Sequence, residues 1–146
     1  MTLLVSSADA RNLKLMAFDV DGVLTDGRLY YGPDGEALKV FNTLDGHGLK
    51  KLAASGVTLA LITGRDTPMV ARRAAELGIQ HVIQGREDKG VALADLAASL
   101  GVTARETGYA GDDEPDVPAL QWAQIAFAPS SGHDCARAAA DHVTRA

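Results

Sequence analysis

The sequence predicts an α/β fold, with a Rossmann-like, mostly parallel sheet, helices on both faces and a β-hairpin inserted after the first strand. Short apolar strands alternate along the chain with helices of about 10–13 residues, the pattern of a parallel sheet with helical crossovers. Polar motifs follow several of these strands directly. Because ligands in such sheets bind at the carboxyl ends of the strands, these motifs predict a site at that edge.

The first elements are a strand and a hairpin. A strand is expected at 14–19, where an apolar run ends at Asp19. Two strand-like pieces, Arg28–Tyr31 and Ala37–Phe41, flank Gly32-Pro33-Asp34-Gly35, whose composition is typical of a hairpin turn. We therefore expect a β-hairpin flap at about 28–41.

The rest of the chain continues the alternation. Pro68 suits the first turn of a helix, and Gly78 suits the position just after its end. Helices are expected at 46–54, 68–77, 88–100, 115–123 and 133–140. Strands are expected at 57–62, 82–83, 107–110 and 125–127, with a last one at Val143.

Composition fits one domain spanning residues 1–146. The chain has 146 residues, of which 47% are hydrophobic, enough to bury a single core, and no Pro/Ser/Gly-rich linker divides it. The net charge of −5 and the lack of a basic run argue against a nucleic-acid partner. The single Cys135 excludes an internal disulfide and fits a reducing compartment.

The N-terminal segment MTLLVSSADARNL has neither a basic region nor a long apolar core, so it does not resemble a secretory signal. No apolar run approaches the roughly 18 residues of a membrane span. We therefore expect a cytoplasmic protein with no membrane partner.

Two aspartates, Asp19 and Asp21, end the first strand. Two close carboxylates form a hard oxygen site for Mg²⁺. They can also divide the work, one attacking as a nucleophile while the other moves a proton. A solvated turn is the plain alternative for such a pair taken alone.

The second motif, Thr63-Gly64-Arg65, follows the strand at 57–62. A threonine hydroxyl at a strand end can donate to a phosphoryl oxygen, and a glycine lets the backbone N–H approach closely. Arg65 can hold the phosphate or another anionic group of the substrate. Taken alone, the tripeptide equally fits the N-terminal turn of a helix.

The third motif centres on Lys89, expected at a helix start, where a positive charge is unfavourable beside the helix dipole. An anionic partner would remove that penalty, and the ammonium would reduce repulsion between a carboxylate nucleophile and a phosphate. We expect Asp88 to cap the helix and Arg86 to offer the substrate a second cation. A solvated surface lysine is the alternative.

The fourth motif is Gly111-Asp112-Asp113-Glu114-Pro115-Asp116, after the strand at 107–110. Mg²⁺ takes oxygen ligands and usually keeps several waters. Asp112 is placed to be a direct ligand, while Asp113 and Asp116 can hold those waters or orient Lys89. An acidic loop leading into a helix explains part of this pattern, but not three aspartates in five residues.

In identity, order and approximate spacing, these four motifs resemble those of the haloacid dehalogenase superfamily, whose members mostly transfer phosphoryl groups through an aspartyl-phosphate. The resemblance implies that Asp19 is the nucleophile and Asp21 the general acid/base. It implies that Thr63 and Lys89 bind and neutralise the phosphoryl group. It also implies that Mg²⁺ is held by Asp19, Asp112 and the backbone carbonyl of Asp21.

The intervals 22–45 and 66–88 are too short to hold a cap domain. This layout resembles the capless sugar-acid phosphatases, over roughly residues 13–145. The resemblance implies a cytoplasmic homotetramer that serves lipopolysaccharide biosynthesis and acts on a sugar-acid phosphate such as 3-deoxy-D-manno-octulosonate 8-phosphate. It implies substrate contacts, in this or an adjacent subunit, for Phe41, Asn42, Asp45, Gly46, Gly64, Arg65 and Arg86.

The hairpin carries more apolar and aromatic side chains than a solvated flap needs, which predicts an interface. These side chains are Leu29, Tyr30, Tyr31, Leu38, Val40 and Phe41. We expect hairpins of a homo-oligomer to pack together, so that one subunit covers the site of its neighbour.

Two segments depart from the family pattern. Family members continue past the last strand through a glycine- and arginine-rich segment into a further helix, whereas this sequence ends at Ala146. The stretch 128–134 also differs from the family's usual apolar-Ala-Asp-Ala-His-Pro pattern. These departures leave the exact substrate open.

Other functions stay open at this point. The same residues would serve a phosphatase for a nine-carbon sugar-acid 9-phosphate or for another small phosphomonoester. A phospho-receiver domain also gathers Asp, Thr and Lys around Mg²⁺, but there the acids near the first strand are adjacent rather than spaced. A non-catalytic accessory subunit is a third alternative. An EF-hand loop fails, because Val23 and Leu24 occupy positions that need an oxygen ligand and a glycine.

Overall fold

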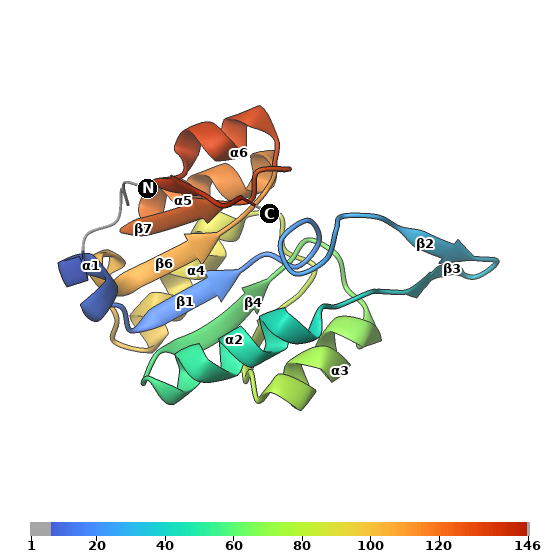
Figure 1. Ribbon diagram of the computed structural model, residues 1–146, viewed down its shortest axis with the longest axis horizontal. Helices are drawn as coiled ribbons and strands as arrows, with labels where there is room; N and C mark the ends of the chain where they lie inside the picture. Colours follow the sequence, from blue (N-terminus) through green and yellow to red (C-terminus); the bar gives the residue numbers. More distant parts are fainter. Residues whose placement is uncertain (1–6, 146) are drawn as a thin grey trace.

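The computed structural model describes residues 7–145 and is built on a six-stranded sheet in the order β5-β4-β1-β6-β7-β8 (Figure 1). Every pairing in this sheet is parallel. Its strands are β1 (Leu15–Phe18), β4 (Thr58–Ile62), β5 (His81–Ile83), β6 (Thr107–Ala110), β7 (Ile125–Ala128) and β8 (His142–Val143). The predicted mostly parallel α/β fold is confirmed.

Helices cover both faces of the sheet. In Figure 1, α2 and α3 lie on one face, and α4, α5 and α6 lie on the other. The helices are α1 (Ser7–Arg11), α2 (Thr43–Ala54), α3 (Pro68–Leu77), α4 (Lys89–Ser99), α5 (Val117–Trp122) and α6 (Asp134–Ala139), with single 3₁₀ turns η1 (Ala104–Glu106) and η2 (Glu114–Asp116). The helix α1 was not among the predicted elements.

The strands feed two apolar cores because successive side chains point to opposite faces. On β1, Leu15 and Ala17 pack with the core that includes Leu93 of α4, while Met16 packs with the core that includes Val70 of α3. All five of these side chains are at most 4% exposed. The sheet edge that carries the polar motifs is thereby held between two packed layers.

The predicted hairpin is present as β2 (Tyr30–Gly32) and β3 (Gly35–Leu38), an antiparallel pair that extends away from the main sheet (Figure 1). Its second strand begins two residues earlier than predicted. The reason is that Gly32 pairs with Gly35 across a tight turn, and Gly35 adopts a positive φ of 115° that glycine tolerates. Tyr31 is 64% exposed, which agrees with the expected apolar surface on the hairpin.

Two helix boundaries also differ from the prediction. Helix α2 begins at Thr43 rather than near residue 46, because the side chain of Asn42 caps it by accepting from the backbone N–H of Leu44 at 2.8 Å. The helix expected at 115–123 is divided into η2 and α5. In contrast, α3 runs from Pro68 to Leu77 with Gly78 in the left-handed region, as predicted.

Among residues 7–145, no helix is long and apolar enough to cross a membrane. The expectation that the N-terminal segment is not a secretory signal falls largely on residues 1–6, which lie outside the described part of the chain.

Candidate active site

Three neighbouring strands place the candidate side chains at one edge of the sheet. Asp19 directly follows β1, Thr63 follows β4, and Asp112 lies two residues after β6, and β1 pairs with both of the other strands. Backbone hydrogen bonds extend the ladder to this level: the N–H of Asp19 donates to the carbonyl of Ala110, at 2.9 Å. The side chains are thus fixed by the sheet rather than by flexible loops.

One pocket at this edge collects most of the predicted residues. It is lined by Asp19, Asp21, Gly27, Thr63, Gly64, Arg65, Glu87, Lys89, Asp112, Asp113 and Pro115. All four predicted catalytic residues and all three predicted metal-binding residues are in this set. Asp116 lies behind it, in contact with Lys89.

The carboxylates of Asp19, Asp112 and Asp116 form a compact cluster, in which one oxygen from each lies within 4.8 Å of the others. Burial raises the pKa of Asp19 above its ordinary range and the nearby charge of Asp116 adds to this, while Lys89 partly offsets both. Burial likewise raises the pKa of Asp112. A divalent cation between Asp19 and Asp112 would favour the charged form of both, so this set of hard oxygen donors fits Mg²⁺.

Gly22 brings the loop after β1 against Asp112. A Cβ at this glycine would lie 1.8 Å from Oδ2 of Asp112, and its φ is +87°, a conformation that L side chains rarely adopt. Only glycine therefore lets the two acidic motifs approach this closely. The sequence analysis did not single out this role of Gly22.

Asp116 has no exposed surface and its two oxygens are already in use. Oδ1 accepts from the hydroxyl of Tyr109 at 2.5 Å and from Nζ of Lys89 at 2.9 Å. Oδ2 accepts from the backbone N–H groups of Asp112 and Asp113, at 3.0 and 3.2 Å. Of the two roles expected for Asp113 and Asp116, holding metal-bound waters or orienting Lys89, the contact of Asp116 with Lys89 fits the second, and the same carboxylate also binds the loop that carries Asp112.

Lys89 connects this anchor to the nucleophile candidate. Its Nζ is 3.1 Å from Oδ1 of Asp19, and the residue is 5% exposed. Burial alone would lower the pKa of Lys89, but the charges of Asp19 and Asp116 outweigh it and hold the pKa above its ordinary value. Lys89 is therefore a buried cation paired with two carboxylates beside the nucleophile candidate, not a solvated surface lysine.

The two residues before Lys89 that carried predictions, Arg86 and Asp88, differ from what the sequence predicts. Asp88 occupies the N-cap position of α4 but makes no capping hydrogen bond, so the predicted cap is wrong. Its carboxylate instead accepts two hydrogen bonds from the guanidinium of Arg86, at 2.7 and 2.8 Å. Because Arg86 is held in this pair and does not line the pocket, its predicted contact with substrate is left without geometric support within one subunit.

The motif at β4 has Thr63 buried at 2% exposure. A Cβ at Gly64 would lie 2.4 Å from Oε1 of Glu87, so a larger residue here would displace that side chain. The side chain of Arg65 turns toward the hairpin, where its Nη2 donates to the hydroxyl of Tyr31 at 3.2 Å and its Nε lies 3.4 Å from Oε1 of Glu36.

The hairpin supplies a site residue that the sequence reasoning missed, Lys39. Its Nζ lies 2.7 Å from Oδ1 of Asp21 and 2.8 Å from Oε2 of Glu36, and its side chain is only 2% exposed. Burial alone would lower the pKa of Lys39, but hydrogen bonds to Asp21 and Glu36 hold it above its ordinary value. Nothing in the spacing of this lysine within an apolar hairpin marks it as an active-site group.

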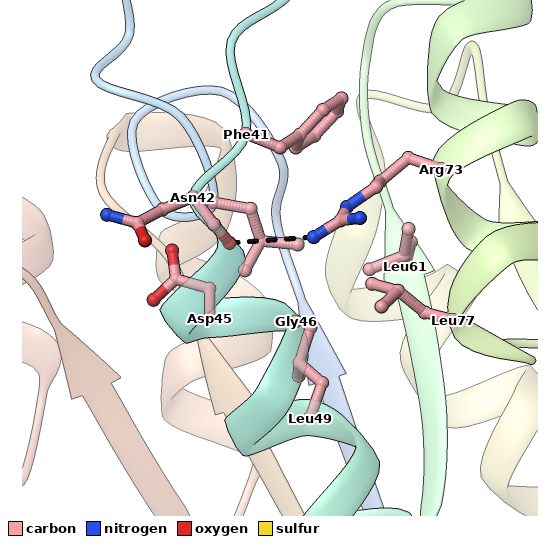
Figure 2. Close-up of a pocket in the computed structure, with 9 residues that line it drawn as sticks. Phe41, Asn42, Asp45, Gly46, Leu49, Leu61, Arg73 and Leu77 are labelled. Carbon is pink, nitrogen blue, oxygen red and sulfur yellow. Dashed lines mark hydrogen bonds between the residues drawn. The ribbon is translucent and has the colours of Figure 1, made fainter.

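Four predicted substrate contacts lie elsewhere in the described chain. Phe41, Asn42, Asp45 and Gly46 border a small, separate pocket around Arg73 (Figure 2). Figure 2 shows the side chains of Asn42 and Asp45 pointing away from this arginine, which donates to the backbone carbonyl of Asn42 at 3.5 Å.

Packing accounts for two members of this group. The guanidinium of Arg73 lies over the ring of Phe41, 5.7 Å from its centroid, and a Cβ at Gly46 would come within 2.5 Å of the same guanidinium. These contacts join α2 to α3 within one subunit. None of the four lines the pocket that contains Asp19.

Comparison with known proteins places these features in context. A family model for haloacid dehalogenase-like hydrolases matches residues 30–124. The 3-deoxy-D-manno-octulosonate 8-phosphate phosphatase of Haemophilus influenzae is 43% identical over 132 residues, which span 90% of this chain and 73% of that protein. The Escherichia coli K12 enzyme of the same name is 41% identical over 138 residues, 94% of this chain and 73% of that protein.

A solved structure shows the same relationship. The Moraxella catarrhalis 3-deoxy-D-manno-octulosonate 8-phosphate phosphatase, crystallised with a magnesium ion, a phosphate ion and a KDO molecule, superposes with a TM-score of 0.91. Its sequence is 44% identical, and the match covers 94% of this chain and 79% of that one. Similarity in sequence and in fold thus extends over most of the chain.

Proposed function

The chain belongs to the haloacid dehalogenase-like hydrolases and is a phosphatase, and on that premise we propose that it is a Mg²⁺-dependent phosphomonoesterase that acts through an aspartyl-phosphate on Asp19. One observation carries this proposal: Lys89 lies 3.1 Å from the buried Asp19, in the pocket that also contains Thr63 and Asp112. A carboxylate nucleophile beside a fixed cation is what attack on a phosphate dianion requires.

In the proposed reaction, an oxygen of Asp19 attacks phosphorus while the bond from phosphorus to the leaving oxygen breaks. Asp21 gives its proton to that leaving oxygen. Asp21 then takes a proton from a water that attacks the aspartyl-phosphate, which releases phosphate and regenerates Asp19. Thr63 donates to a phosphoryl oxygen, and Lys89 offsets its charge.

Asp19, Asp112 and the backbone carbonyl of Asp21 would hold Mg²⁺. When bound, the cation supplies positive charge that stabilises the transferring phosphoryl group. In the proposal, Asp113 and Asp116 do not bind the cation directly but support the residues that do. The four hydrogen bonds that Asp116 accepts from protein groups agree with this supporting role.

The proposed substrate is 3-deoxy-D-manno-octulosonate 8-phosphate, which would place the protein in lipopolysaccharide biosynthesis in the cytoplasm. The named relatives support this choice. In the pocket, Gly64 and Arg65 would meet the substrate beside the phosphate.

We also propose a homotetramer in which a neighbouring subunit covers each site. The exposed apolar side chains of the hairpin support it, including Tyr31 at 64% and Val40 at 55% exposure. Phe41, Asn42, Asp45, Gly46 and Arg86 would then contribute to substrate binding across the subunit boundary, since none of them lines the pocket of its own chain.

Phosphate release from a panel of substrates tests the proposal. The panel comprises the eight-carbon sugar-acid 8-phosphate, a nine-carbon sugar-acid 9-phosphate and p-nitrophenyl phosphate. Asp19→Asn should reduce turnover at least about 10³-fold, because it removes the attacking charge at constant size. Asp95→Asn on α4, which lies outside the pocket, is the matched control and should leave turnover unchanged.

Each alternative function predicts a different outcome of these assays. Stoichiometric phosphorylation without turnover would indicate a phospho-receiver domain. No reaction with any phosphate would indicate an accessory subunit. A preference for the nine-carbon substrate would keep the chemistry and change the assigned substrate, while residual activity in Asp19→Asn would refute the aspartyl-phosphate.

A further inference from the structure

Asp21 is held by a single close partner. Nζ of Lys39 donates to Oδ1 of Asp21 at 2.7 Å, whereas the hydroxyl of Thr25 is 3.4 Å from the same oxygen. Oδ2 of Asp21 is shielded from solvent and has no hydrogen-bond partner among the described residues. The side chain is 20% exposed, and Asp21 lines the pocket that also contains Asp19.

We propose that Lys39 is a positioning residue for phosphoryl transfer, which fixes the orientation of the carboxyl group of Asp21 toward the leaving oxygen of the substrate. This inference rests on the proposed function. Without the lysine, Asp21 would keep only the long contact with Thr25, and its carboxyl group would be free to turn about its side-chain bonds.

The burial of Lys39 indicates that the fold holds its ammonium in a specific position. A lysine side chain that is 2% exposed is costly unless its charge is paired, and here two carboxylates meet it. The second, Glu36, is itself 7% exposed and lies on β3, three residues before Lys39. Glu36 is therefore a second carboxylate that holds the ammonium beside Asp21.

The same contacts tie Asp21 to the hairpin. Glu36 also lies 3.4 Å from Nε of Arg65, and Arg65 in turn donates to Tyr31 on β2 at 3.2 Å. A chain of polar contacts thus runs from the exposed hairpin to the proposed acid/base. Any group that orders the hairpin also orders Asp21, which gives the flap a part in the chemistry beyond covering the pocket.

The proposed step is balanced without a further reactant. The proton of the Asp21 carboxyl group moves to the oxygen that leaves phosphorus, and the electron pair of the broken bond stays on that oxygen. Asp21 becomes anionic 2.7 Å from the ammonium of Lys39. Attack by water on the aspartyl-phosphate later returns a proton to Asp21, and Lys39 keeps its protons throughout.

Leaving-group dependence separates this role from a structural one. Phenyl and p-nitrophenyl phosphate have nearly the same shape, but p-nitrophenolate leaves readily because the nitro group stabilises its charge, whereas phenolate needs a proton donor. With Lys39→Met, kcat/KM should fall about 10²-fold for phenyl phosphate and less than about threefold for p-nitrophenyl phosphate. Lys50→Met, an exposed lysine on α2, is the matched control and should change neither value.

Folding of each variant is checked by thermal unfolding. Lys39→Met leaves Glu36 buried without its ammonium partner, so the double variant with Glu36→Gln serves where the single variant does not fold. The same selective loss is expected from the double variant. Asp21→Asn, which removes the acid/base itself, gives the largest loss of kcat/KM for phenyl phosphate that Lys39→Met could cause.

An equal fall for both substrates, or no fall for either, would overturn the role of Lys39. Wild-type protein without activity on these esters and on the sugar-acid phosphates, or an active Asp19→Asn variant, would instead refute the proposed function on which the inference rests. The first pair of outcomes compares variants with an active wild type, so the two failures are distinguishable.

Discussion

Replacing Asp116 with asparagine should destabilise the whole fold. In the native protein, four donors meet its two oxygens: the hydroxyl of Tyr109 and Nζ of Lys89 at Oδ1, and two backbone N–H groups at Oδ2. An asparagine has one acceptor oxygen and one NH₂ group. With its NH₂ at the Oδ2 position, two backbone N–H donors would face another donor. With its NH₂ at the Oδ1 position, Nζ of Lys89 would face another donor, while the hydroxyl of Tyr109 can turn to accept, inside a site with no exposed surface.

The magnitude follows from the one or two bonds that are lost. A hydrogen bond to a charged group contributes about 1.5–3 kcal/mol, so Asp116→Asn should lower the free energy of unfolding by about 1.5–6 kcal/mol. A domain of this size loses about 2–4 °C of Tm per kcal/mol. The expected fall in Tm is therefore on the order of 10 °C and at least about 3 °C.

Circular dichroism during heating, with metal chelated, measures this fall directly. Asp113→Asn is the matched control, because Asp113 is exposed and caps η2 by accepting from backbone N–H groups, among them that of Glu114, a role that asparagine also fills. Its Tm should change by less than about 2 °C. If Asp116→Asn unfolds within the same range as this control, the hydrogen-bond argument is refuted.

Three further outcomes are expected. Gly22→Ala should weaken Mg²⁺ binding in a calorimetric titration, because its Cβ would displace Oδ2 of Asp112, while Gly78→Ala has a similar positive φ without a clash and should leave binding unchanged. Lys14→Met should lower Tm near neutral pH, and the difference from wild type should narrow as pH falls from about 4.5 to about 2, because Lys14 and the backbone of Thr103 lower the pKa of Glu106 to about 2 and that stabilisation is lost on protonation. Light scattering at micromolar concentration should give a tetramer, and a fully active monomer would contradict the proposed cover by a neighbour.

Much of the site could be predicted because its residues follow strands that the sequence marks clearly as apolar runs. Asp19, Thr63 and Asp112 each come just after an apolar run, and adjacent parallel strands end at a common edge. Position along the chain then translates directly into position in space. The same reasoning succeeded for α3, where Pro68 and Gly78 mark the two ends.

The predictions that were wrong and the residues that were missed share a physical cause. Polar side chains bind partners that are distant or ambiguous in the sequence. Asp88 sits at the N-cap of α4 but pairs with Arg86 instead of capping. Lys39 reaches the first motif from the hairpin across 18 positions of sequence. In the sequence, Asp116 cannot be told apart from Asp112 and Asp113. Of these three aspartates, only Asp116 is fully buried, and its carboxylate accepts from the hydroxyl of Tyr109.

The charges of the site suggest an order of binding. Its connected groups comprise five carboxylates and three cations, which leaves an excess of two negative charges when all are ionised. They are Asp19, Asp21, Glu36, Asp112, Asp116, Lys39, Arg65 and Lys89. A phosphate dianion entering this pocket alone would meet net repulsion, whereas one divalent cation would first cancel the excess.

Binding of inorganic phosphate should therefore depend on Mg²⁺. Titration calorimetry of the EDTA-treated protein should show at least a tenfold weaker affinity than the Mg²⁺-loaded protein, a difference of about 1.4 kcal/mol or more. Asp112→Asn removes one of the five carboxylates together with a proposed ligand, so it should bind phosphate in EDTA better than wild type does while losing the response to Mg²⁺. Equal phosphate affinity with and without the cation would show that the three protein cations suffice, and that the acidic cluster serves the fold rather than the metal.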